Sequence, residues 1–161
     1  MLIKKGLIFI LVITFVFSIG ACDKEDEPSG PSEEEQEEID QQLIEQYIAD
    51  NNLETTKTST GLHYIIHAPG NNNHPTSNSW IEGVYQGELL DGTDFTNGVQ
   101  VIESRLWELI PGCQEGLSLI GEGGKIKMII PSRLAYVDQD IMGQTNAVLV
   151  FYFEIDLVYT E

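Results

Sequence analysis

The stretch Glu108–Tyr136, ELIPGCQEGLSLIGEGGKIKMIIPSRLAY, places a short helix signal directly before a strand signal. After Pro111-Gly112, the residues CQEGLSLI are typical of a helix or helical turn, and the glycines of GEGG end it. In the residues that follow, one side of the chain carries Gly124, Ile126, Met128 and Ile130. Alternation of this kind predicts a β-strand. We therefore expect a short helix, Cys113–Ile120, that leads through a glycine turn into a strand.

Further strands are predicted on both sides of this stretch. GLHYIIHAPG, which begins at Gly61, alternates and ends in a Pro-Gly turn. Between residues 81 and 89 the odd positions are mostly apolar, which places Tyr85 on an inner face, and Asp91-Gly92 is a turn. Residues 99–109 are strand-like without a defined register. The final strand carries one apolar face: Leu149, Phe151, Phe153, Ile155 and Leu157. Antiparallel strands around one short helix predict an α+β fold.

A separate helix is predicted near the N-terminus. Ser32 and Glu35 have the spacing of a capping box. The residues after them form one apolar stripe, made of Ile39, Leu43, Ile44, Tyr47 and Ile48. The stripe is expected to pack on the following domain, and packing on a second copy of the chain is the alternative.

The charge of the chain excludes some partners. The 161 residues carry a formal charge of -18, with 26 acidic residues against 8 Lys and Arg. Nucleic-acid binding is not expected, because phosphate contacts need clustered basic side chains. From Asp23 to Glu45 there are eleven acidic residues and one base, Lys24. This segment is typical of a solvated spacer or an exposed helix face.

The first residues indicate export. Two lysines precede GLIFILVITFVFSI, an apolar run shorter than the roughly 20 residues of a membrane span. A membrane-anchoring helix is the alternative. The run ends in IGAC, which resembles the bacterial lipobox and implies cleavage before Cys22 and lipid on its sulfur. The next residues, DKEDE, resemble the export signal of Bacteroidetes surface lipoproteins. With Cys22 lipidated, Cys113 has no partner, and no intrachain disulfide is expected.

Other chemistries are not supported by spacing. His63 and His67 are four residues apart on a predicted strand, where that spacing is about 13 Å, and His74 stands alone. No metal site is therefore expected. GEGGK lacks the spacing of a phosphate loop, and DGTD lacks the ligands of a calcium cage. Neither Cys113 nor Ser118 lies in a nucleophile motif.

Three ordered blocks resemble the FKBP-type family. VYQGELLDGTDF resembles Tyr-x-Gly-x-Leu-x-Asp-Gly-x-x-Phe. LIPGCQEGLSLIGEGGKIKMIIPSRLAY resembles Val-Ile-Pro-Gly-Trp-x-x-Gly-Leu, followed by Met-x-x-Gly and Ile-Pro-x-x-Leu-Ala-Tyr-Gly. NAVLVFYFEIDLV resembles the closing Ala-x-Leu-x-Phe-x-Val-x-Leu. The resemblance covers residues 61–161 and implies a curved antiparallel β-sheet wrapped around the short helix, with a ligand pocket between them.

The resemblance also implies an activity and a site. FKBP-type domains are peptidyl-prolyl cis-trans isomerases that work without a cofactor. Tyr136 would donate its hydroxyl to a substrate carbonyl, and Ile110 would offer its backbone N–H. The pocket walls would be Tyr85, Phe95 and Phe151. Leu109 matches the aliphatic position before Ile110.

The chain departs from the family pattern at several of these positions. Thr96 stands where the family has Asp, and Val137 where it has Gly. Cys113 replaces the Trp of the pocket floor, which removes a large contact surface. The loop 138–147, DQDIMGQTNA, has no proline, so Ile141 or Met142 would supply its aliphatic wall.

These patterns predict four segments. They are a lipoprotein signal peptide at 1–21, an acidic linker at 22–32, an N-terminal helix and connector at 33–60, and an FKBP-like domain at 61–161. The first hypothesis is a membrane-anchored, exported isomerase that acts on X-Pro bonds of proteins. The alternative is a weak or inactive FKBP-like module that binds a protein partner. A lipoprotein whose acidic arm does the binding is a third hypothesis.

Overall fold

The computed structural model describes residues 30–160. The predicted signal peptide and Cys22 lie outside these residues. The described residues from Pro31 onward form one compact unit. Its elements are α1 (Glu33–Asp50), β1 (Thr56–Lys57), β2 (His63–Ala68), β3 (Trp80–Leu89), β4 (Gln100–Arg105), the 3-10 helix η1 (Leu106–Glu108), α2 (Pro111–Leu117), β5 (Lys125–Ile130), the 3-10 helix η2 (Ser132–Leu134) and β6 (Leu149–Tyr159).

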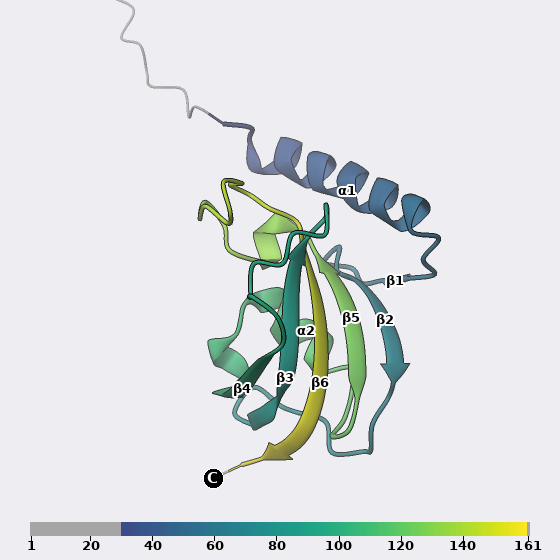
Figure 1. Ribbon diagram of the computed structural model, residues 1–161, viewed down its shortest axis with the longest axis vertical. Helices are drawn as coiled ribbons and strands as arrows, with labels where there is room; N and C mark the ends of the chain where they lie inside the picture. The colour runs from purple at the N-terminus through teal and green to yellow at the C-terminus, as the bar shows by residue number, and fades with distance from the viewer. Residues whose placement is uncertain (1–29, 161) are drawn as a thin grey trace, which may run out of the picture. The chain divides into compact units, whose positions relative to one another are not determined.

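The strands form one open antiparallel sheet in the order β1-β2-β5-β6-β3-β4. Figure 1 shows the sheet curving around α2, while α1 crosses the far end of the strands. We call the face that α2 covers the inner face and the opposite one the outer face. The predicted α+β class and the curved antiparallel sheet around a short helix are confirmed. β1 and β4 are the edge strands of the sheet.

Helix α1 begins with the predicted capping box. Ser32 Oγ accepts from Glu35 N–H at 3.3 Å, and Ser32 N–H donates to Glu35 Oε2 at 2.9 Å. Glu33, Glu34 and Glu35 fill the first turn, where carboxylates interact favourably with the positive end of the helix dipole. The cap therefore fixes where the helix begins.

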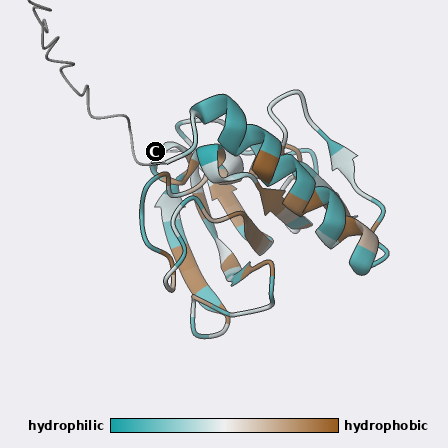
Figure 2. Cartoon of the chain, turned by 90° about the horizontal axis from the view of Figure 1, so that it is seen from above, coloured by the Kyte–Doolittle hydropathy of each residue, from teal (hydrophilic) through white to brown (hydrophobic). Residues whose placement is uncertain are grey.

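Helix α1 docks on the outer face of its own domain, as the apolar stripe predicted. Ile44 is 1% exposed and packs in one cluster with Ile129, Val148 and Val150. Ile39 and Leu43, at the edge of the stripe, stay 42% exposed. Figure 2, seen from above, shows α1 as a mostly hydrophilic helix with isolated hydrophobic positions. Because α1 covers the outer face of the sheet at Ile129, the end of β5 near Ile129 is buried on both faces.

One strand prediction was wrong at its end. Leu157 was expected on the apolar face of β6, but it is 41% exposed, and Val158 is buried instead. The cause is a β-bulge, since Gly83 pairs with Ile155 while Glu82 pairs with Leu157, which leaves Asp156 extra. The extra residue shifts the alternation by one position, so every later side chain changes face.

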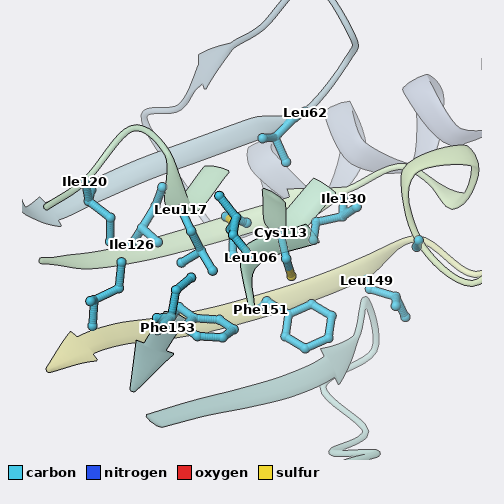
Figure 3. Packing of buried hydrophobic residues seen from close by; sticks show 14 of the residues in the cluster. Leu62, Leu106, Cys113, Leu117, Ile120, Ile126, Ile130, Leu149, Phe151 and Phe153 are labelled. Carbon is cyan, nitrogen blue, oxygen red and sulfur yellow. The ribbon is translucent and has the colours of Figure 1, made fainter. Parts of the chain in front are cut away.

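Helix α2 packs directly against β5 because two glycines face the strand. A Cβ added at Gly112 would lie 2.4 Å from Ile130 Cγ2, and one at Gly116 would lie 2.2 Å from Met128 Sδ. Figure 3 shows the helix side chains Cys113 and Leu117 packed among residues of β5 and β6. The helix begins at Pro111, two residues earlier than expected, because proline suits the first helical position.

No helix within residues 30–160 combines the length and apolarity needed to cross a membrane.

We expect Gly112→Ala to destabilise the domain. Ile130 is fully buried and β-branched, so Cγ2 cannot turn away and the backbone must shift, at a cost of about 1–3 kcal/mol. The gain in helix propensity is less than ~1 kcal/mol, so the clash dominates. Urea unfolding measures the difference. Gly30→Ala is the control, since nothing lies within 4 Å of an added Cβ there. Equal unfolding free energies for the two variants would contradict the close packing of α2.

Candidate functional site

A pocket of about 140 Å³ lies on the inner face of the sheet, beside the first turn of α2. Its lining comes from β3, β4, η1, α2, β6 and the segment after η2. The lining residues are Tyr85, Ile102, Glu108, Leu109, Ile110, Cys113, Tyr136, Phe151 and Phe153. These positions span 69 residues of sequence, so the fold assembles the pocket.

The structure brings most of the predicted site residues together in this pocket. They are Tyr85, Leu109, Ile110, Cys113, Tyr136 and Phe151. Two predicted residues do not line it. Phe95 stands behind Phe151, with ring centroids 5.6 Å apart in an edge-on arrangement. Ile141 packs against the core cluster and does not supply a pocket wall.

The aromatic rings form a continuous wall. Tyr85 lies 5.4 Å from Phe153 and 6.1 Å from Phe151, measured between ring centroids. Phe95 can approach this wall because position 87 is glycine: a Cβ there would lie 2.4 Å from Phe95 Cζ. The Gly of the Tyr-x-Gly pattern therefore makes room for a ring. Offset and edge-on contacts of this kind are favourable and hold the rings in place.

Cys113 forms the floor, and Figure 3 shows its side chain directed toward the ring of Phe151. It is 3% exposed, and burial raises the pKa of its thiol to about 12. The thiol is therefore neutral throughout the physiological pH range. A neutral thiol adds no charge to the pocket floor and is a poor nucleophile, because the thiolate is the reactive form.

The backbone N–H of Ile110 is one polar group at the pocket. Ile110 precedes Pro111, which holds it in an extended conformation (φ -59°, ψ 149°). Its carbonyl accepts from Gln114 N–H at 3.0 Å, but its N–H makes no hydrogen bond within the described residues. The side chain of Gln114 fixes this segment by donating to Leu109 O at 2.6 Å and to Trp107 O at 3.2 Å.

The hydroxyl of Tyr136 is the second polar group. Burial raises the pKa of Tyr136, and the neighbouring Cys113 and Tyr85 add to the shift. The hydroxyl therefore stays protonated at neutral pH and keeps its proton to donate. Among residues 30–160, no protein group forms a hydrogen bond with it. Both donors at the pocket are thus available to a ligand.

Thr96, which stands where the family has Asp, forms hydrogen bonds within its own loop and to β3. Its Oγ1 accepts from Gly87 N–H at 3.2 Å and lies 2.8 Å from Asp94 Oδ1. The Asp94 carboxylate also accepts from Gly98 N–H at 2.7 Å. Hydrogen bonds from Thr96, with those from Gly98 and Gln86, lower the pKa of Asp94. This network orders the loop beside Phe95 and places no charge in the pocket.

The turn predicted at Asp91-Gly92 is present, with Thr93 N–H donating to Asp91 Oδ1 at 2.9 Å. His63 is buried in β2 beside Thr55, and His67 is exposed. In the described part of the chain, no group of three or more His, Cys, Asp or Glu side chains could hold a metal ion.

Sequence reasoning missed three lining residues: Ile102, Glu108 and Phe153. Phe153 follows Phe151 by two on the same face of β6, so the alternation already contained the signal. Ile102 lies on β4 opposite Gly83, and its inward direction depends on a register that the sequence did not define.

A model of the family described as FKBP-type peptidyl-prolyl cis-trans isomerase matches residues 71–158, more than half of the chain. The chain belongs to this family. The match covers β3 to all but the last residue of β6, and it includes every residue that lines the pocket.

Curated relatives carry the same family name. The chain is 38% identical over 102 residues to the FKBP-type peptidyl-prolyl cis-trans isomerase FkpA of Escherichia coli K12, which covers 61% of this chain and 38% of that protein. It is 42% identical over 101 residues to the probable FkpA of Neisseria meningitidis, which covers 58% of this chain and 36% of that protein. The chain thus spans less than half the length of these relatives.

Solved structures agree on the fold. The crystal structure of FkpA from Escherichia coli superposes with a TM-score of 0.66 at 31% identity, covering 80% of this chain and 62% of that one. A peptidyl-prolyl cis-trans isomerase from Pseudomonas syringae superposes at 0.65 and 24% identity, covering 83% of this chain and all of that one. The two superpositions cover 80% and 83% of this chain, which is more than the residues 71–158 matched by the family model. The similarity of fold therefore extends beyond those residues.

We expect Cys113 to resist thiol reagents in the folded protein. With a pKa of about 12, only about one thiol in ten thousand is ionised at pH 8, and the side chain is 3% exposed. The test uses a Cys22→Ala variant, because the chain has two cysteines. Iodoacetamide should label the native chain very slowly and the chain in concentrated guanidinium chloride rapidly. Rapid labelling of the native chain would show that the pocket floor opens to solvent.

Proposed function

We propose that the chain is a peptidyl-prolyl cis-trans isomerase that acts on exposed X-Pro bonds of proteins. The observation that carries the proposal is the pocket: an aromatic cup with two donors, Ile110 N–H and Tyr136 Oη, in a chain of this family. Its one acidic lining residue, Glu108, accepts hydrogen bonds from Ser104 Oγ and Arg105 N–H. A cavity of about 150 Å³ lined by apolar side chains holds benzene. The pocket, at about 140 Å³, therefore suits the smaller ring of proline.

The reaction requires a pocket of suitable shape and polarity, and it requires no reactive side chain. Rotation of the peptide bond passes a barrier of about 18–20 kcal/mol, because the planar amide loses its resonance on the way. The twisted amide carries less charge on its carbonyl oxygen than the planar one. An apolar pocket therefore favours the twisted amide over the ground state, and this difference in binding lowers the barrier.

The two donors have separate tasks in this account. Tyr136 donates to a substrate carbonyl and orients the peptide across the pocket. Ile110 N–H, held in place by Pro111 and Gln114, donates to a second carbonyl. Tyr85 and Phe151 surround the proline ring, while Phe95 supports Phe151 from behind. Fixing the peptide on both sides of the reacting bond reduces the entropy lost at the transition state.

The place of action follows from the N-terminal sequence. The apolar run and IGAC support export and lipid attachment at Cys22. We infer an anchored lipoprotein of the cell envelope, whose clients are exported proteins with exposed X-Pro bonds. The acidic linker predicted at 22–32 would then separate the domain from the membrane.

A binding module is the second candidate, and two observations favour it. Cys113 forms a floor much smaller than the family's Trp, and the proline-free loop 138–147 leaves Ile141 outside the pocket lining. Both changes remove apolar contact with a bound peptide. In that case the chain would hold a proline-containing segment of a partner protein without accelerating its isomerisation.

Exchange NMR of a short X-Pro peptide tests the proposal. Such a peptide shows separate cis and trans signals, and uncatalysed exchange takes tens to hundreds of seconds. Catalytic amounts of the purified full chain should produce exchange cross-peaks between the two signals. A folded chain that produces none over a range of residues before proline would contradict the isomerase proposal and support the binding module.

We expect Tyr136→Phe to lower kcat/KM by about fivefold, because one neutral hydrogen bond contributes about 1 kcal/mol. The fold should be unchanged, since the hydroxyl has no partner within the described residues. Isomerisation rates and circular dichroism measure the two effects. Tyr64→Phe is the matched control, since Tyr64 lies on β2 away from the pocket lining. An unchanged rate in Tyr136→Phe would remove the donor role of this hydroxyl.

We expect Cys22→Ala to release the chain from membranes. The lipid on the sulfur would be lost, and acyl chains contribute about 0.8 kcal/mol for each buried CH₂ group. Fractionation of cells that express each form, followed by immunoblotting, measures the distribution. Cys113→Ala is the control and should remain in the membrane fraction. Membrane association of Cys22→Ala equal to that of the unaltered chain would contradict lipid anchoring.

A further inference from the structure

The 3-10 helix η2 stands between β5 and Tyr136, and it has no cap of its own. A short helix leaves its first N–H groups without partners inside the helix. Its N-cap residue is Pro131, which has no side-chain acceptor and makes no side-chain cap bond. The N–H of Ser132 therefore needs an acceptor from elsewhere, because Ser132 is only 3% exposed and water does not reach it freely.

Helix α1 provides this acceptor. Ser132 N–H donates to Asp40 Oδ2 at 2.7 Å, across 92 residues of sequence. Asp40 is 1% exposed, and Gln36 Nε2 donates to its other oxygen at 2.7 Å. A buried carboxylate is costly unless it is hydrogen-bonded, and bonds to a charged acceptor are about twice as strong as neutral ones. Asp40 is thus a strong, fixed cap for η2.

The cap is connected to Tyr136 by a short, ordered path. Leu134 N–H donates to Pro131 O and Ala135 N–H to Ser132 O, each at 2.9 Å. Tyr136 follows Ala135 directly and lines the pocket. A second contact, Arg133 Nη2 to Glu37 Oε1 at 3.1 Å, is exposed to solvent. Exposed ion pairs contribute little, so the Asp40–Ser132 bond is the stronger of these two contacts between α1 and η2.

We infer that Asp40 is a positioning residue for prolyl isomerisation: by capping η2 it fixes Pro131–Tyr136, and so α1 determines how the Tyr136 hydroxyl is presented to the substrate. The inference rests on the proposed function. Asp40 is absent from the pocket lining and acts through η2. The docking of α1 also rests on Ile44, Tyr47 and Ile48, which pack on residues other than those of η2, so docking and positioning are separable.

A double-mutant cycle in the full chain tests the inference. Asp40→Ala should lower kcat/KM by about fivefold in the unaltered chain, comparable to the loss of one hydrogen bond. In the Tyr136→Phe background it should change kcat/KM by less than about twofold, because residues that act through one group are not additive. Equal effects in both backgrounds would overturn the inference and indicate general destabilisation.

Two further variants separate the loss of the hydrogen-bond acceptor for Ser132 N–H from the loss of a negative charge on α1. Asp40→Asn keeps an oxygen that can accept from Ser132 N–H, so it should restore most of the activity lost in Asp40→Ala. Glu38→Gln removes the same charge from an exposed position of α1 and should have no effect. If Asp40→Ala does not fold, Asp40→Leu, which keeps the buried volume but has no acceptor, takes its place. Activity in Asp40→Asn as low as in the alanine variant would contradict the capping role.

A second readout does not depend on catalysis. Side-chain and amide NMR signals of Tyr136 should shift in Asp40→Ala and stay in place in Glu38→Gln. If the unaltered chain has no isomerase activity, the proposed function fails, but these signals still test the coupling. Unchanged Tyr136 signals in a folded Asp40→Ala chain would overturn the inference whether or not the chain is an isomerase.

Discussion

The close approach of helix α2 to strand β5 is the constraint on which the pocket depends. Gly112 and Gly116 lie one turn apart and bring the helix onto Ile130 and Met128 with no side chain between them. The first turn of the helix then faces β3 and β6, so that Cys113 lies against Phe151. Pro111 both begins the helix and holds Ile110 extended. The N–H of Ile110, a lining residue, makes no hydrogen bond within the described residues. One helix start thus places the floor and a donor of the site.

The opposite face of the sheet contributes through α1. Ile44 packs on Ile129 of β5 and Val150 of β6, while Asp40 caps η2. The second donor, Tyr136, therefore depends on a helix that lies outside the residues matched by the family model. The pocket is held from two sides: α2 and β5 position the floor, and α1 with η2 positions the hydroxyl.

Much of this arrangement could be predicted from sequence because its signals are local. The capping box at Ser32, the inward Tyr85 and the helix before β5 are each visible within ten residues. The failures depend on contacts between separate segments of the chain. Leu157 faces outward because of a bulge that is visible only once β6 is paired with β3. Ile102 was missed because the register of β4 was undefined, and Asp40 because its partner is 92 residues away.

The central claim is that this pocket binds the X-Pro segment, and an NMR titration of the ¹⁵N-labelled chain with an X-Pro peptide tests it most directly. Chemical-shift changes are expected at Ile110, Cys113, Tyr136 and Phe151. The amide signal of Ile110 should shift because its N–H gains a hydrogen-bond acceptor. A second hollow of about 250 Å³ shares Tyr85 and Phe153 with this pocket, but Val84 and Tyr152, which line only the second hollow, should show none of these changes. Shifts confined to that second hollow, with Ile110 and Tyr136 unmoved, would contradict the account.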